Sequence, residues 1–95
     1  MPEIHEKSAH TELARVLASE VRKFVDEMII PNESRLAQDG NASFRLQSEL
    51  VEKARYAGLW GLFYPLSHGG RMASLEDYLI VAEQEGHSEF SPAIL

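Results

Sequence analysis

Apolar residues recur every three or four positions over the first third of the chain, which predicts a long amphipathic helix. The positions that share this spacing are Leu13, Val16, Leu17, Val21, Phe24, Val25, Met28 and Ile29. Such spacing places apolar side chains on one buried helix face. Ser8 or Thr11 is the expected cap, since either hydroxyl can accept a hydrogen bond from a free backbone amide. Pro31 lacks a backbone donor and crowds the preceding turn, so the helix should kink or end there.

A second helix is expected after the turn signal at Gly40, which stands between Asp39 and Asn41. Residues 32–39 form a polar continuation of the first helix, with Leu36 as its main apolar contact. The expected buried face of the second helix consists of Leu46, Leu50, Val51, Ala54 and Ala57. Ser43 is its expected cap. Gly58 is the expected residue just past its end, because glycine readily adopts the left-handed conformation that ends many helices.

Residues 58–65 are apolar but interrupted by glycine and proline, which predicts a buried connector. Its aromatic residues Trp60, Phe63 and Tyr64 are expected in the core, since aromatic side chains contribute strongly to core packing. The following segment, His68-Gly69-Gly70, is expected to form a turn.

A third helix is predicted from Ser74, a cap followed by acidic residues in the first turn, to Gly86. Its expected buried stripe consists of Leu75, Tyr78, Leu79 and Ala82, widened by Ile80 and Val81. Ser91 and Pro92 then indicate another helix start, a cap with proline at the first helical position. Because only three residues follow, we expect the chain to be truncated there.

No strand pattern persists, so the predicted fold is all-α: a small bundle of about three main helices plus the start of a fourth. Residues 1–10 are expected to form a flexible N-terminal segment and residues 11–95 the helical domain. The 95 residues suffice for one small domain, and 44% of them are hydrophobic. The absence of cysteine excludes disulfides and thiolate metal sites.

The charge of the chain also excludes some partners. Its net charge is −6, and no stretch gathers the cations that a phosphate backbone attracts, so neither nucleic acid nor an anionic membrane is an expected partner. No apolar run approaches the roughly 20 residues of a membrane span. The N-terminus has no apolar signal region and carries acids that transit peptides avoid. These features predict a cytoplasmic protein.

Few residues carry recognisable chemistry. Phosphate-binding and dinucleotide-binding glycine motifs are absent, and so is the Glu-x-x-His spacing that a di-iron bundle needs. Glu83 and His87 are four residues apart, but Gly86 stands between them, so we expect an exposed helix end rather than a metal site. Ser67 and His68 are expected to be turn residues rather than parts of a catalytic triad. We therefore expect no catalytic, cofactor-binding or metal-binding residue within this chain.

Four segments, in order, match the pattern of one protein family. Residues 21–33 contain an Arg-x-Phe segment, an apolar pair, proline and an acid, and in this they resemble the first helix of acyl-CoA dehydrogenases. Residues 50–62 are similar to the family's second helix and to the Gly-Leu-x-Gly-Leu segment that follows it. Residues 65–70 are similar to the loop that runs from a proline to a Gly-Gly pair. Residues 74–86 are similar to the next helix, which carries an acidic pair before a glycine. The resemblance runs from about Thr11 to Leu95. The family commonly has an acid and an aromatic residue where residues 66–68 read Leu-Ser-His.

The resemblance implies a longer enzyme with a β-domain and a second helical domain, between which FAD lies. A glutamate from the late region removes the proton next to the thioester of an acyl-CoA substrate, and flavin takes the hydride. The family is usually a homo-oligomer. Its acyl channel is walled in part by the helix that begins here at Ser91, so Ile94 and Leu95 are the implied substrate-binding residues. The alternative for these two side chains is an ordinary place in the core.

Two other functions remain open. A free-standing helical interaction module, whose grooves receive a partner helix, fits the composition equally well. The interrupted helix after Pro92 counts against it. A carboxylate metal bundle is weakened by the missing Glu-x-x-His.

Overall fold

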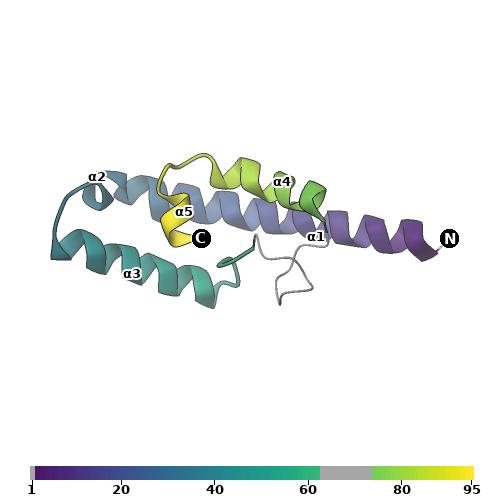
Figure 1. The fold of residues 1–95 in the computed structure, drawn as a ribbon, viewed down its shortest axis with the longest axis horizontal. Coiled ribbons are helices and arrows are strands. Elements are labelled where there is room, and N and C mark those ends of the chain that lie inside the picture. Colours follow the sequence, from purple (N-terminus) through teal and green to yellow (C-terminus); the bar gives the residue numbers. More distant parts are fainter. Residues whose placement is uncertain (1, 63–73) are drawn as a thin grey trace.

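Three long helices lie side by side in the computed structural model, which describes residues 2–62 and 74–95, with side chains from residue 11 (Figure 1). They are α1 (Pro2–Phe24), α3 (Asn41–Tyr56) and α4 (Leu75–Glu85). A single-turn helix, α5 (Ser91–Ile94), packs against α3. No strand occurs within the described ranges, and the predicted all-α bundle of three main helices and the start of a fourth is confirmed.

Helix α1 begins earlier than predicted. It starts at Pro2, so the prediction that Ser8 or Thr11 begins the helix is wrong. Proline is well suited to the first helical position, because its missing N–H would have no partner there. The Thr11 hydroxyl instead donates to an Asp77 carboxylate oxygen on α4, at 3.2 Å. That residues 1–10 form a flexible segment stays a prediction.

The break at Pro31 is confirmed. Helix α1 passes into a π-turn, η1 (Val25–Ile29), a 3-10 turn, η2 (Ile30–Asn32), and then the short α2 (Glu33–Leu36). Pro31 lies within η2, where it cannot donate to the preceding turn. The side-chain amide of Asn32 donates to the Met28 carbonyl at 2.7 Å and so occupies an acceptor near the break.

The buried face of α1 is shifted from the predicted one. Leu13 and Val16 are 40% and 56% exposed, so their predicted burial is wrong, whereas Ala14 and Ala18 are buried. The rest of the predicted face is buried, with Met28 half-buried: Leu17, Val21, Phe24, Val25 and Ile29. The reason is the position of α4. It contacts α1 along its length, and the small alanine side chains allow close approach of the two helices.

Helix α3 starts differently from the prediction but buries most of the predicted face. Leu46, Leu50 and Ala54 are buried and Val51 is half-buried, whereas Ala57 is exposed. Gly40 occupies the cap position with a φ of 114°, so the prediction that Ser43 is the cap is wrong. The Ser43 hydroxyl instead donates to the Leu36 carbonyl at 2.9 Å, which closes the turn between α2 and α3.

The end of α3 confirms the predicted role of Gly58. Its φ is 76°, and its N–H donates to the Arg55 carbonyl at 3.0 Å. The Leu59 N–H donates to the Ala54 carbonyl at 2.9 Å, which completes a Schellman motif. The Leu59 side chain is buried immediately after the turn, so the helix end directs the chain back to the core.

The connector that follows is only partly described. Leu59 and Leu62 are buried, as a buried connector requires, but Trp60 is 43% exposed and its predicted place in the core is wrong. The Arg55 guanidinium lies over the Trp60 ring, 4.7 Å from its centroid, which stabilises the ring at the surface. The predictions for Phe63, Tyr64 and the turn at residues 68–70 lie outside the described residues.

Helix α4 has the predicted ends but a different buried face. The Ser74 hydroxyl accepts a hydrogen bond from the Asp77 N–H at 3.1 Å, and the helix ends before Gly86. Leu75 and Leu79 are 73% and 57% exposed, so their predicted burial is wrong. Val81 is buried as predicted, and the other predicted members are half-buried: Tyr78, Ile80 and Ala82. Asp77, which was not predicted, is buried as well. The side of α4 that faces α1 buries Val81 in the core, and the Thr11 hydroxyl donates to the Asp77 carboxylate on that side.

The core joins all the long helices and the chain end. Its side chains come from α1, η1, α2, α3, the connector, α4 and α5: Leu17, Ala18, Val21, Phe24, Val25, Ile29, Leu36, Leu46, Leu50, Ala54, Leu59, Leu62, Val81, Ile94 and Leu95. Phe90 precedes the first turn of α5, so the prediction that Ser91 is its cap is wrong. The Ser91 hydroxyl is instead buried without a hydrogen-bond partner.

Candidate functional site

The two predicted substrate-binding residues lie at the end of α5. Ile94 and Leu95 are 1% and 7% exposed and belong to the core. The Leu95 N–H donates to the Ser91 carbonyl at 2.8 Å, and the Leu95 carbonyl accepts from the Gly61 N–H at 2.9 Å. The first bond closes α5, and the second joins the end of α5 to the connector. Within this chain both side chains have the packing of ordinary core residues, and their contact with substrate stays a prediction.

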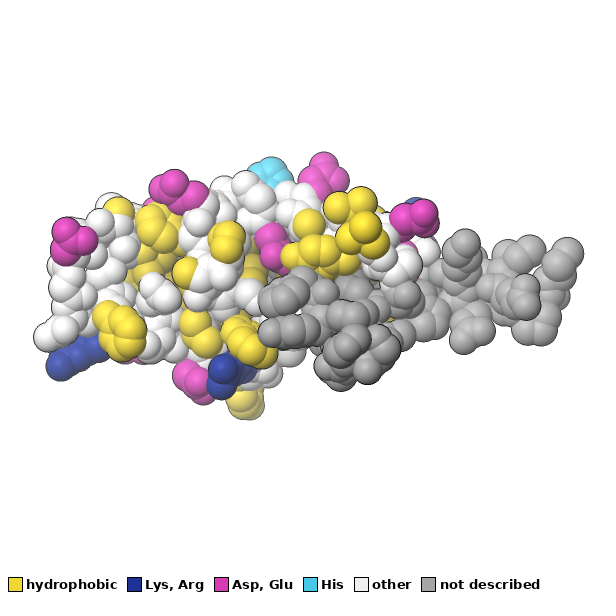
Figure 2. Space-filling view, viewed as in Figure 1, with side chains coloured by type: hydrophobic (Ala, Val, Ile, Leu, Met, Phe, Trp, Pro, Cys, Tyr) yellow, Lys and Arg dark blue, Asp and Glu magenta, His cyan; other side chains and the backbone are white. Residues whose placement is uncertain are grey.

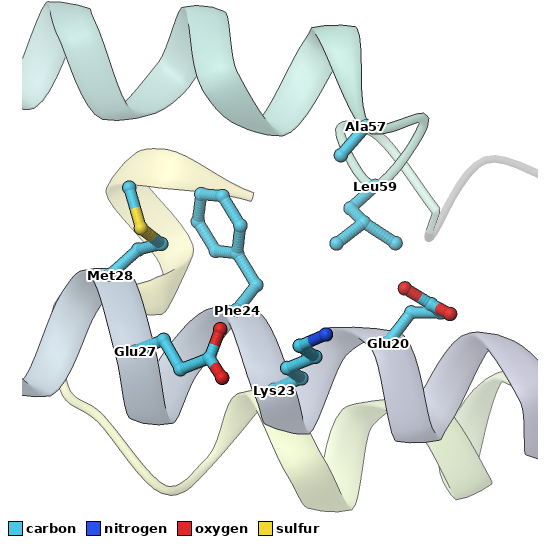
Figure 3. Close-up of a pocket in the computed structure, with 7 residues that line it drawn as sticks. All are labelled: Glu20, Lys23, Phe24, Glu27, Met28, Ala57 and Leu59. Carbon is cyan, nitrogen blue, oxygen red and sulfur yellow. The ribbon is translucent and has the colours of Figure 1, made fainter.

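A small groove lies between α1 and the end of α3 (Figure 3). Buried Phe24 and Leu59 and half-buried Met28 point into it, and exposed charged side chains of α1 lie at its edge. The lining residues are Glu20, Lys23, Phe24, Glu27, Met28, Ala57 and Leu59. Its volume is about 170 Å³, whereas sites for cofactors and drug-sized ligands measure at least about 300 Å³. The groove is therefore too small for a flavin.

A larger hollow of about 670 Å³ lies at the C-terminal end of α3. It is lined by Glu52, Lys53, Arg55 and Tyr56, all of them exposed. Glu52 and Arg55 are 3.8 Å apart, as expected for a solvated face with pairs spaced three residues apart. All four lining residues are open to solvent, whereas a cofactor site encloses most of its ligand, so this shallow hollow does not fit a flavin.

Tyr78 and Glu85 form a half-buried polar pair on α4. The tyrosine hydroxyl donates to the Glu85 carboxylate, with oxygen–oxygen distances of 3.3 and 3.4 Å. Burial raises the pKa of the Glu85 carboxyl, and the hydrogen bond from Tyr78 partly opposes that rise. Burial and the nearby Glu85 charge raise the pKa of the Tyr78 hydroxyl. A carboxyl with a raised pKa can serve as a general acid or base, but none of the described grooves contains this pair.

Arg22 links α1 to the end of α4. Its guanidinium donates to Asp26 at 2.9 Å and to Gln84 at 3.4 Å, and lies 2.8 Å from the Nε2 atom of His87. Because a guanidinium can only donate, Nε2 is the acceptor in this contact. His87 therefore faces a cation, and Glu83 is exposed beside it. Among the residues that the structure describes, no three potential metal ligands of the His, Cys, Asp or Glu type come together.

Neither the Tyr78–Glu85 pair nor the Arg22–His87 contact was predicted from the sequence. Tyr78 and Glu85 are seven residues apart, which places them two turns apart on one side of a helix, so their contact could have been predicted from spacing alone. The contact of Arg22 with His87 joins residues 65 positions apart. No local pattern signals such a pair, because it depends on how α4 lies against α1. The Ser67 and His68 prediction falls outside the described residues.

Comparison with known proteins decides the family. The profile of the family described as "Acyl-CoA dehydrogenase, N-terminal domain" matches residues 11–94, which include every described helix except the first turns of α1. The chain belongs to the acyl-CoA dehydrogenase family. The match covers the four segments whose resemblance the sequence showed, and it reaches Ile94 in α5.

Two members of the family resemble the chain in sequence. They are the rat (Rattus norvegicus) and mouse (Mus musculus) proteins named "Acyl-CoA dehydrogenase family member 11", each 30% identical over 95 residues. The alignment covers 90% of this chain but 12% of either relative, so the chain spans about an eighth of their length. No solved structure is significantly similar to the chain. In the described part of the chain, none of the helices has the length and apolar character that crossing a membrane requires.

Proposed function

We propose that this chain is the N-terminal portion of an FAD-dependent acyl-CoA dehydrogenase, which carries out α,β-dehydrogenation of an acyl-CoA thioester. The family match over residues 11–94 is the observation that carries the proposal. In that enzyme the chain is a scaffold that supplies part of the acyl-channel wall and is not competent alone. We further propose that the enzyme is cytoplasmic, acts in fatty acid metabolism and forms a homo-oligomer.

FAD, when bound, supplies the hydride acceptor of this reaction. Neither of the two described hollows fits it, because the groove beside Phe24 is too small and the hollow at the end of α3 is open to solvent. We therefore place the flavin and the catalytic base in chain beyond this helical domain, and no catalytic step is assigned to residues 11–95.

The decisive experiment reads the encoding frame beyond codon 95 and assays its product. We expect a continuing frame with a β-rich stretch and a late helical region that carries a glutamate. The purified long protein should bind FAD and reduce an electron-accepting dye when given an acyl-CoA, and the 95-residue chain alone should do neither. A stop codon directly after Leu95 would exclude this proposal.

The channel role of Ile94 can be tested in the long protein with Ile94→Val, which removes one methylene. If Ile94 lines the acyl channel, the ratio of kcat/KM for long over short acyl-CoA substrates should change roughly fivefold, because one methylene in an apolar pocket alters transition-state binding by such factors. Ile29→Val is the matched control, since Ile29 is fully buried in the same core but lies in η1. Equal, small effects of both variants on this ratio would assign Ile94 to the core alone.

A free-standing interaction module is the second candidate, and the exposure of Leu75 and Leu79 on α4 favours it. Both candidates use the same fold. They differ in whether the cell makes residues 1–95 as a separate chain, which the size of the native protein on an immunoblot would reveal.

A further inference from the structure

The outer side of α4 carries an apolar stripe that nothing in the described structure covers. Leu75 and Leu79 are 73% and 57% exposed and lie one turn apart. Half-buried Ala82 and exposed Gly86 continue the stripe at spacings of three and four residues. Figure 2 shows hydrophobic side chains gathered over α4 with acidic side chains around them. Two leucines followed by two small residues form a surface against which another helix can pack closely.

Helix α4 cannot bury this stripe against its own neighbour. Its opposite side, with Asp77 and Val81, already packs on α1, and Thr11 anchors that side through Asp77. A helix presents only one side to a single neighbour, so Leu75 and Leu79 remain at the surface. Large apolar side chains that stand together at a surface mark interaction sites in soluble proteins.

The charged side chains that α4 itself carries are all acidic. Glu76 and Glu83 are exposed and lie two turns apart along one edge of the stripe. The sequence from residue 75 to residue 95 contains no Lys or Arg, but it contains five acids: Glu76, Asp77, Glu83, Glu85 and Glu89. Arg22 reaches α4 from α1, but it contacts Gln84 and His87 and is ion-paired with Asp26. None of the ion pairs among the described residues involves Glu76 or Glu83.

We propose that the stripe Leu75, Leu79, Ala82 and Gly86 is a docking surface for an amphipathic helix whose own apolar face is flanked by Lys or Arg. Apolar contact supplies the affinity, and the Glu76 and Glu83 carboxylates select a cationic edge. A second copy of this chain docked antiparallel through α4 would place the two Glu76 and Glu83 edges against each other, which like-charge repulsion disfavours. This inference does not depend on the dehydrogenase activity.

The test measures binding of two synthetic helical peptides to the 95-residue chain by fluorescence anisotropy. The peptides share one leucine stripe and differ in their flanks, lysine in one and glutamate in the other. We expect the lysine peptide to bind more tightly than the glutamate peptide. The double variant Glu76→Lys/Glu83→Lys should bind the lysine peptide about tenfold more weakly than the parent chain does. This variant should also bind the glutamate peptide more tightly than the lysine peptide.

Matched variants separate the stripe from general surface effects. The variant Glu49→Lys/Glu52→Lys changes the net charge by the same amount as Glu76→Lys/Glu83→Lys, but on the exposed side of α3. It should still bind the lysine peptide more tightly than the glutamate peptide. Leu79→Asp should abolish binding, whereas Phe44→Asp, at a residue 69% exposed on α3, should not. Circular dichroism confirms that each variant is helical.

Amide chemical-shift changes locate the bound peptide. Shifts confined to α4 support the proposal. Equal binding of both peptides, shifts centred on α3, or a dimer of the chain that Leu79→Asp dissociates would each overturn it.

Discussion

At the scale of single residues, Asp77 is a carboxylate buried on the side of α4 that faces α1. Asp77 is 8% exposed, and its carboxylate accepts from the Thr11 hydroxyl while its N–H donates to the Ser74 hydroxyl. A buried carboxylate is tolerated only when such partners are present. The apolar spacing of α4 predicts that Asp77 lies outside the core. Its burial could not be predicted from α4 alone, because its hydrogen-bond partner Thr11 lies on α1. The cap at Ser74, a local contact, was predictable.

Glu85 should make the stability of the chain depend on pH. Burial raises the pKa of Glu85 above its ordinary value of 4.5, so the folded state favours the protonated carboxyl. Its contribution to stability is therefore fully present below pH 4.5 and is lost as the pH rises through the raised pKa. Glu85→Gln cannot ionise, so at pH 7 it should be more stable than the parent chain, by less than about 1 kcal/mol because the site is half open to water.

Urea unfolding between pH 4 and pH 8 measures this difference. Exposed Glu83 provides the control, and Glu83→Gln should follow the parent curve. Parallel pH curves for Glu85→Gln and the parent chain would contradict the prediction.

At the scale of helices, the break at Pro31 and the C-terminal ends were more predictable than the starts, of which only the one at Ser74 is confirmed. Pro31, Gly58, Ser74 and Gly86 mark breaks or ends that the structure confirms, because backbone chemistry at a helix end is local. Ser43 fails as a cap because the chain enters α3 one turn earlier, at Gly40. Gly58 and Gly86 both end helices, but in different conformations: Gly58 has a φ of 76° and Gly86 a φ of −65°.

This difference predicts opposite responses to alanine. Gly58→Ala should destabilise the chain by about 1 kcal/mol, since a side chain resists the left-handed conformation. Gly86→Ala should cost nothing or stabilise slightly, because its new methyl would meet the Ala82 and Glu83 carbonyls at an ordinary 3.5 Å. Urea unfolding of both variants checks the pair, and a loss of stability in Gly86→Ala that equals the loss in Gly58→Ala would refute it.

At the scale of the whole molecule, one core joins α1, α3, α4 and α5, although the molecule is elongated, 54 by 22 by 18 Å. Leu50 lies in that core at 1% exposure, on the side of α3 that packs inward. A chain of this size has little stability to spare, since small domains bury a smaller share of their surface. The loss of one large core side chain should therefore affect every helix together.

Leu50→Ala should destabilise the chain by about 2–5 kcal/mol, through lost burial and the cavity left behind. That is a large part of the roughly 5–15 kcal/mol typical of a domain, so the urea midpoint should fall sharply. Tyr56→Ala is the control on the same helix, because Tyr56 is 97% exposed and should change the midpoint little. If circular dichroism showed α3 alone melting in Leu50→Ala, the single cooperative core would be disproved.

The sequence by itself determined the all-α class, the break at Pro31 and the helix ends at Gly58 and Gly86. It also determined the family resemblance that the profile match over residues 11–94 bears out. These features depend on local backbone chemistry and on the order of short motifs. Only the tertiary structure decided that Leu75 and Leu79 lie outside while Asp77 lies inside, and that Arg22 meets His87. An amphipathic pattern says how much apolar surface a helix carries. Which side is covered depends on where neighbouring helices lie and which hydrogen bonds they supply, and that information is not local.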